Sequence, residues 1–185
     1  MLKKLSKKAV VAIVATLLTL TVSVGATVAY ILRQTPPIEN KFTPVFVSCS
    51  VQEKFDGTTK SAVCVQNTGD ISAYIRVAVI ATWVSTADGS VYGESPILGN
   101  DYALTLGSSS RWVLGSDGFY YYAEAVESTA VTDILIQTLV QSGEAPDGYA
   151  FNAQILATAV QAEPSEAVEI VWGVTVEENG RLTVS

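Results

Sequence analysis

Histidine, the side chain most often used for acid–base catalysis, is absent from this chain of 185 residues. Its absence removes serine–histidine–aspartate and cysteine–histidine catalysis as well as the HExxH zinc motif. The sequence also contains no GxxxxGK[ST] or GxGxxG loop that would bind nucleotide phosphates. We therefore predict no catalytic residue, no cofactor and no enzymatic activity.

Carboxylates are the remaining candidates for a metal centre. A zinc hydrolase needs about three protein ligands and an open position for water. Asp101, Asp117, Glu124 and Glu127 could supply oxygen ligands, but nothing in their spacing requires them to meet. We interpret them as solvated loop and strand-edge residues and predict no metal site.

The two cysteines, Cys49 and Cys64, flank a segment centred on Asp56-Gly57. Asp-Gly favours a two-residue hairpin turn, which would place the cysteines opposite each other on neighbouring strands. The sequence predicts a disulfide between them, worth about 3 kcal/mol for a loop of this length. The alternative is two unpaired thiols that act as small apolar side chains.

A second group of turn-forming residues, Asn67, Thr68, Gly69 and Asp70, separates two apolar runs. A turn that needs residues tolerant of the left-handed conformation explains this group. The run Tyr120-Tyr121-Tyr122 could form a stacking platform for glycans. A strand with alternate rings in the core is the simpler interpretation.

The elements that must position these residues are predicted to be strands. Alternating apolar residues occupy 75–83 and 149–157, and shorter apolar runs occupy 102–106, 111–114, 119–126, 131–140 and 168–176. Turn residues separate these runs. Eight to ten short strands predict an all-β fold, a jelly-roll-like antiparallel β-sandwich over residues 45–185. A short helical turn is expected near residues 164–169, where proline and acidic residues suit a helix start.

The N-terminus has the layout of an export signal. Lys3, Lys4, Lys7 and Lys8 precede an uncharged run over residues 9–32, with small residues near its end. Residues 1–29 are predicted to be a signal peptide cut between Ala29 and Tyr30. The run is also long enough to span a bilayer, so a retained membrane anchor is the alternative.

Residues 30–44 follow the predicted cleavage point and contain three prolines. Proline removes a backbone donor and restricts the residue before it, which favours an extended arm. The arm begins with the apolar residues Tyr30, Ile31 and Leu32, and we predict that it donates a strand to another subunit. Because cleavage would release these residues from the membrane segment, processing would control assembly.

The charge balance bears on possible partners. The chain has 11 basic and 18 acidic residues, and four of the basic residues precede residue 9. The processed chain would therefore carry 7 basic and 18 acidic residues, a net charge of −11. Such a surface repels phosphate backbones, so we predict no nucleic-acid partner.

Several motifs, taken in order, resemble one family. The segment GATVAY (25–30) resembles the end of signal peptides removed by a SipW-type signal peptidase, and NKFT (40–43) resembles the start of the mature domain in such proteins. VQNTGDISAYIRV (65–77), Trp112 with GSDGFYYY (115–122), ILATAVQA (155–162) and Trp172-Gly173-Val174 match in the same order. The chain thus resembles the TasA/camelysin-like family of exported Gram-positive proteins over nearly its whole length.

The resemblance implies a jelly-roll domain and assembly into extracellular biofilm-matrix or pilus-like fibres. The implied partners are further copies of the chain in a head-to-tail homopolymer, a SipW-type peptidase during export, and the membrane before cleavage. The implied location is the extracellular matrix or cell surface. Two alternatives stay open: a monomeric cell-surface adhesin and, with less support because histidine is absent, a camelysin-like secreted metallopeptidase.

Overall fold

The computed structural model describes residues 7, 8, 10–12 and 45–184. The chain divides into two units, residues 1–43 and 44–185. In the first unit the five described residues are helical and exposed. None of the helices in the described ranges is long and apolar enough to cross a membrane. Apart from those five residues, the predicted signal peptide (1–29), the cleavage point at Ala29 and Tyr30, the arm (30–44) and its donor residues Tyr30, Ile31 and Leu32 lie outside the described residues.

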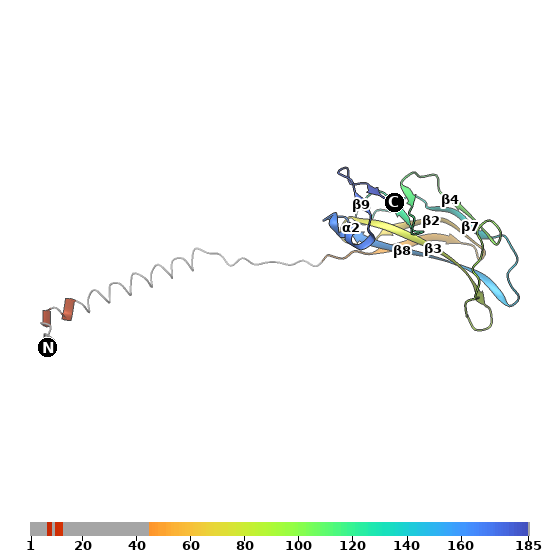
Figure 1. Cartoon of the computed structure of the whole chain (residues 1–185), viewed down its shortest axis with the longest axis horizontal. Helices are drawn as coiled ribbons and strands as arrows, with labels where there is room; N and C mark the ends of the chain where they lie inside the picture. Colours follow the sequence, from red (N-terminus) through yellow and green to blue (C-terminus); the bar gives the residue numbers. More distant parts are fainter. Residues whose placement is uncertain (1–6, 9, 13–44, 185) are drawn as a thin grey trace. The chain divides into compact units, whose positions relative to one another are not determined.

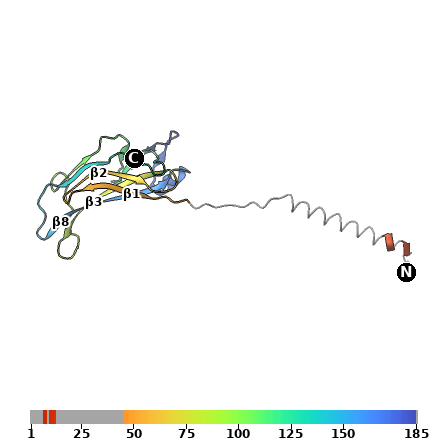
Figure 2. The same ribbon diagram turned by 180° about the vertical axis from the view of Figure 1, so that it is seen from behind.

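The second unit is built almost entirely of strands (Figures 1 and 2). Its described elements are β1 (Cys49–Phe55), β2 (Thr59–Asn67), β3 (Ala73–Ser85), β4 (Tyr102–Leu106), β5 (Trp112–Leu114), β6 (Tyr120–Tyr122), β7 (Ile136–Gln141), β8 (Tyr149–Gln161), α2 (Glu166–Trp172), β9 (Thr175–Val176) and β10 (Leu182–Thr183).

The strands form two four-stranded sheets and one small hairpin. The first sheet has the order β1-β2-β7-β4, the second has the order β5-β6-β3-β8, and β9 pairs with β10. Every strand pair is antiparallel. This architecture confirms the prediction of an all-β sandwich.

The main core lies between the two sheets. Val63 and Val65 of β2 meet Ile75 and Val77 of β3 there, and all four side chains are fully buried. Ile75 and Val77 follow the two-residue period predicted for residues 75–83, and Val63 and Val65 show the same period, because alternate side chains of a strand point to the same face. The pairing of β3 with β8 runs without a break from Ala73↔Gln161 to Ser85↔Tyr149.

A second, smaller core covers the outer face of the second sheet at one end. Val168 of α2 and Leu182 of β10 pack there against Tyr74 and Tyr121. Because both faces of β6 are covered, Tyr121 and Tyr122 are both buried, on opposite sides of the strand. The predicted strand with alternate rings in the core is present, since Tyr120 and Tyr122 face the main core, and the ring of Tyr121 between them is buried in the second core.

The predicted strand over residues 168–176 is also wrong, because most of it is helix α2. Glu166 and Glu169 lie in its first turn, where carboxylates favour the positive end of the helix dipole. Gly173 ends the helix in the left-handed conformation, and its N–H donates to the carbonyl of Glu169. The helical turn expected near residues 164–169 therefore continues one turn further.

Two predicted strands are shorter than expected. Of residues 119–126 only β6 is a strand, and of residues 131–140 the strand β7 begins at Ile136. The intervening chain passes from the second sheet to the first and makes only single bridges: Glu124↔Arg181, Ala73↔Val126 and Gln66↔Val131. A segment that changes sheets cannot keep a continuous ladder with either one.

Candidate functional site

The β1–β2 hairpin has a different register from the one that its sequence predicts. Cys49 lies opposite Asn67, and Cys64 lies opposite Gln52. The two cysteines are therefore offset by three residues along the strands, which corresponds to about 10 Å. Both are free, and the predicted Cys49–Cys64 disulfide is not formed.

Two local features produce this offset. The turn is centred on Gly57-Thr58 rather than on Asp56-Gly57, since Phe55 pairs with Lys60. Gly57 has φ +99°, and glycine at the first central position is typical of a type II′ hairpin turn. The register then shifts once more between Gln52 and Lys54, opposite Ala62, whose φ is +51°. A bulge of this kind adds a residue to one strand only.

The cysteines also lie on opposite faces of the first sheet. Cys49 packs against the main core, whereas Cys64 lies between the fully buried Val63 and Val65 and therefore points outward. Both thiols are half-buried, and burial raises the pKa of each above its ordinary value. Each therefore stays protonated at neutral pH.

Asn67 is the most deeply buried polar residue of the predicted turn. Its side-chain amide donates to the carbonyls of Ile71 and Val126, each at 2.8 Å, and its Oδ1 accepts from the N–H of Gly69 at 2.9 Å. The side chain is fully buried. It thus ties the end of β2 to the start of β3 and to the chain that crosses between the sheets.

Gly69 is required for space rather than for a left-handed conformation. It is absent from the described residues with positive φ, as are the other three members of the turn. A Cβ at Gly69 would stand 2.5 Å from the carbonyl oxygen of Phe46 and 2.9 Å from the N of Ser48. The interpretation based on left-handed tolerance is therefore wrong, and close approach of residues 46–48 is the reason for glycine.

The same turn binds the segment before β1. The N–H groups of Thr68 and Gly69 donate to the carbonyl of Ser48 at 2.9 and 3.1 Å, and the N–H of Asp70 donates to the carbonyl of Phe46 at 2.9 Å. The hydroxyls of Thr68 and Ser48 are 3.0 Å apart. We call this set of contacts between residues 46–48 and residues 68–70 the clasp.

A free strand edge is the second feature of interest. β8 has 13 residues, ends its sheet, and pairs on one side only among the described strands. The other free edges of the two four-stranded sheets belong to β1, β4 and β5, which have seven, five and three residues. A long unpaired edge presents a row of backbone donors and acceptors to any extended chain.

Beside this edge the core is incompletely covered. β1 lies next to β8 but belongs to the other sheet and does not pair with it. The inward side chains Val51, Ile155, Ala157 and Ala159 pack against the core yet are only half-buried. Their partial exposure leaves apolar surface open beside the edge of β8.

Two cavities follow β8 along this side. One of about 420 Å³ is lined by Val51 and Glu53 of β1 and by residues 152–156 of β8. The other, of about 520 Å³, continues past residues 150–153 to the β1–β2 turn. Lys60 lines both and forms an ion pair with Glu53. We call this channel the β8 groove.

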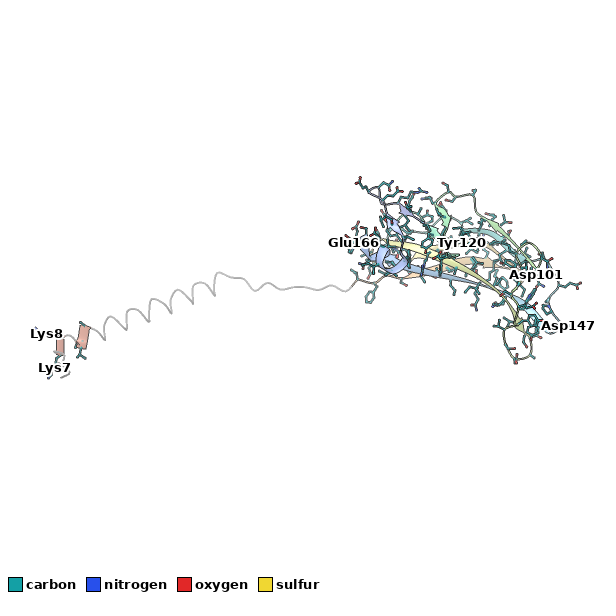
Figure 3. All side chains as sticks on the ribbon, viewed as in Figure 1. Lys7, Lys8, Asp101, Tyr120, Asp147 and Glu166 are labelled. Carbon is teal, nitrogen blue, oxygen red and sulfur yellow. The ribbon has the colours of Figure 1, made fainter. Side chains whose placement is uncertain are left out.

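The candidate carboxylates do not come together. Asp101 accepts from the N–H of Ile97, Asp117 accepts from the hydroxyl of Tyr121, and Glu124 pairs with Arg111. Figure 3 shows Asp101 near the loop that carries Asp147, at the opposite end of the sandwich from Glu166 of α2. Within the described residues no group of three or more carboxylates or cysteines could hold a metal ion.

A polar surface hollow lies beside Arg111. Ser109 and Thr132 line it, and Asp133 holds the Arg111 guanidinium through hydrogen bonds from Nε, at 2.7 Å, and from Nη2. The hydroxyl of Ser109, which donates to Asp133, and the Arg111 guanidinium both lower the pKa of that carboxyl. Since Asp133 and Glu124 already neutralise Arg111, the hollow offers no free charge to a ligand.

The fold and these contacts define an antiparallel β-sandwich with one long free edge. A scan against protein-family models found no match, and searches of curated proteins and of solved structures found none either. The clasp and the β8 groove are therefore interpreted from their own geometry. Sequence patterns locate the residues of the clasp and of the β8 groove. They do not reveal that β8 ends its sheet or that the backbone of residues 46–48 passes over Gly69.

Proposed function

We propose that the chain is an exported structural protein, a subunit of extracellular biofilm-matrix or pilus-like fibres that assembles by donating its N-terminal strand. The observation that carries the proposal is the free edge of β8, with half-buried core residues beside it. An added strand would gain main-chain hydrogen bonds along β8 and would bury Val51, Ile155 and Ala157 further. In a head-to-tail contact the arm of one subunit binds the β8 edge of the next. Each subunit at the end of a chain therefore keeps one of these two surfaces free, and the contact repeats to form a filament.

The donor in this proposal is the arm, residues 30–44, which begins with Tyr30, Ile31 and Leu32. Export with cleavage between Ala29 and Tyr30 by a SipW-type peptidase would free it, and the uncleaved chain would remain in the membrane. The motif resemblance to TasA/camelysin-like proteins and the two four-stranded sheets, which suit a jelly roll, support the same proposal.

The experiment compares filament formation by the processed chain (30–185) and two β8 variants. Ile155→Asp places a carboxylate in the β8 groove, whereas Thr158→Asp places one on the opposite, exposed face of the same strand and outside the groove. We expect electron microscopy to show filaments for the unmodified chain and for Thr158→Asp but not for Ile155→Asp. Circular dichroism checks that each variant is folded. Filaments from folded Ile155→Asp, or from a chain without residues 30–44, would contradict the proposal.

A monomeric adhesin is the second candidate, and one observation favours it. The connection between β3 and β4 carries four exposed apolar side chains at the loop end of the sandwich: Val91, Tyr92, Ile97 and Leu98. Exposed apolar groups of this kind often mark binding surfaces. Light scattering of the processed chain separates the two candidates, because an adhesin would keep the mass of a monomer at all concentrations.

A further inference from the structure

The clasp continues the line of β1 beyond the strand itself. In the β1–β2 pairing the residue numbers of opposite residues add to 116 from Cys49↔Asn67 to Gln52↔Cys64. The clasp bonds join Ser48 to Thr68 and Phe46 to Asp70, which is the same register. Residues 46–48 therefore leave the domain in the direction of β1 and do not turn back beside it.

This direction matters because the β8 groove of the same domain lies alongside β1. Val51 lines the groove, and β1 lies next to β8. Three backbone hydrogen bonds hold residues 46–48 in the line of β1, and their backbone lies against Gly69. To enter this groove, the arm of the same chain would therefore have to use some of its own residues, 30–44, for the reversal, which would leave a shorter strand to place along β8.

Without such a restraint the arm would favour its own groove. A segment on a short flexible tether has an effective concentration in the millimolar range. At micromolar protein, an arm free to turn back would occupy its own domain about a thousand times more readily than a second copy. Head-to-tail assembly therefore needs a feature that prevents self-insertion.

We propose that the clasp is this feature: it directs the N-terminal arm away from its own β8 groove and into the groove of a second copy. The inference rests on the proposed function and adds to it a role for Asn67, Gly69 and Asp70. In this role the turn acts on the choice of partner, while the β8 edge supplies the binding surface.

The native cysteines provide a measurement of groove occupancy. Cys49 is the next inward residue of β1 after Val51, so a strand in the groove would shield its thiol. Cys64 lies on the outer face and serves as the internal reference. The ratio of alkylation rates at Cys49 and Cys64, read by mass spectrometry, reports occupancy in monomers and in filaments separately.

The test compares the processed chain with Gly69→Ala and Gly93→Ala. Gly93 has no atom within 4 Å of the position that a methyl group would take and no positive φ, so it is the matched control. We expect Gly69→Ala to raise the monomer fraction about tenfold, with Cys49 protected in those monomers. Gly93→Ala should behave like the unmodified chain. Equal filament yields for Gly69→Ala and the unmodified chain would overturn the role of the clasp and leave the fibre proposal intact.

A second variant leaves the domain untouched, in case Gly69→Ala fails to fold. Six glycine and serine residues inserted between Pro44 and Val45 let the arm reverse outside the clasp, and the same six residues added after Ser185 are the control. We expect self-closed monomers from the first insertion only. Filaments in undiminished yield would overturn the inference.

The two proposals fail in different ways. If the unmodified chain stays monomeric and Cys49 is freely alkylated, the fibre proposal fails. The role of the clasp is then tested by the variant with six residues inserted between Pro44 and Val45, through the alkylation rate of its Cys49. Protection gained on insertion supports the clasp, and its absence overturns it. If the unmodified chain is monomeric with Cys49 already protected, the arm enters its own groove and both proposals are wrong.

Discussion

The two ends of β2 are joined to turns that work in different ways. At one end Asp56 accepts hydrogen bonds from the N–H groups of Thr58 and Thr59, and all three residues are exposed or nearly so. At the other end Asn67 is fully buried and bonds to chain segments up to 59 residues away. The first turn depends on neighbours in sequence, and the second depends on the assembled fold.

The glycines of the two turns show the same contrast. Gly57 has φ +99° and no atom within 4 Å of the position that a Cβ would take, so its conformation alone explains it. Gly69 has no positive φ, and the backbone of residues 46–48 occupies the space of a side chain. A local turn and a tertiary contact can therefore carry similar residue types for unrelated reasons.

The largest expected effect is at Asn67. Asn67→Ala removes one hydrogen bond each from the Ile71 carbonyl, the Val126 carbonyl and the Gly69 N–H. The Val126 carbonyl keeps its bond from Ala73 and the Gly69 N–H keeps its bond to Ser48. With about 1 kcal/mol for each lost bond, we expect a loss of about 3 kcal/mol in the free energy of unfolding, measured by urea denaturation. Asp56→Ala affects only exposed bonds and should cost less. Equal losses would remove the distinction between the two turns.

Gly69→Ala and Gly57→Ala give the next largest difference. A methyl at Gly69 displaces backbone, and overpacking of this kind costs about 1–3 kcal/mol. A methyl at Gly57 meets open space, and only the left-handed conformation opposes it, at about 1 kcal/mol. Hydrogen exchange should show faster exchange of the Thr68 and Asp70 amides in the first variant alone. Unchanged exchange at those amides would contradict the close approach.

The local turn is visible in the sequence, but its consequences are not. Asp56-Gly57 correctly marks a hairpin between two strands, yet the turn is centred one residue later and a bulge follows at Ala62. Because side chains alternate along a strand, an odd shift moves a residue to the other face. This is why the predicted cysteine pairing is wrong although both strands are present.

The parts that could be predicted share a cause. Alternation over 75–83 and 149–157 reflects burial of one strand face and identifies β3 and β8. The order of strands in a sheet depends on long-range packing, so the free edge of β8 has no local signal. Helix α2 is only partly predictable because Val168, Ile170 and Val171 suit a strand as well as a helix.

An engineered disulfide tests the observed register directly. Gln52 lies opposite Cys64 on the same outward face, so Gln52→Cys should form a disulfide with Cys64 when Cys49 is replaced by serine. We expect a gain of about 2 kcal/mol in unfolding free energy under oxidising conditions. Mass spectrometry of the unreduced peptides identifies the link. The unmodified chain should yield two free thiols. A Cys49–Cys64 disulfide in that chain would contradict the observed register and support the one predicted from Asp56-Gly57.

The smallest expected effect is the pH response of the exposed turn. Hydrogen bonds from Thr59 and Thr58 lower the pKa of Asp56 below 3.8. A carboxyl whose pKa is lowered by folding stabilises the folded state above its unfolded pKa, and this contribution is lost as pH falls through the folded value. The amide resonances of Thr58 and Thr59 should therefore titrate together below pH 3.8. Asp56→Asn should abolish that titration while the Asn67 amide bonds, which carry no titratable group, stay unchanged across the same range. A midpoint above 3.8 would mean that the turn does not hold the carboxylate as the structure shows.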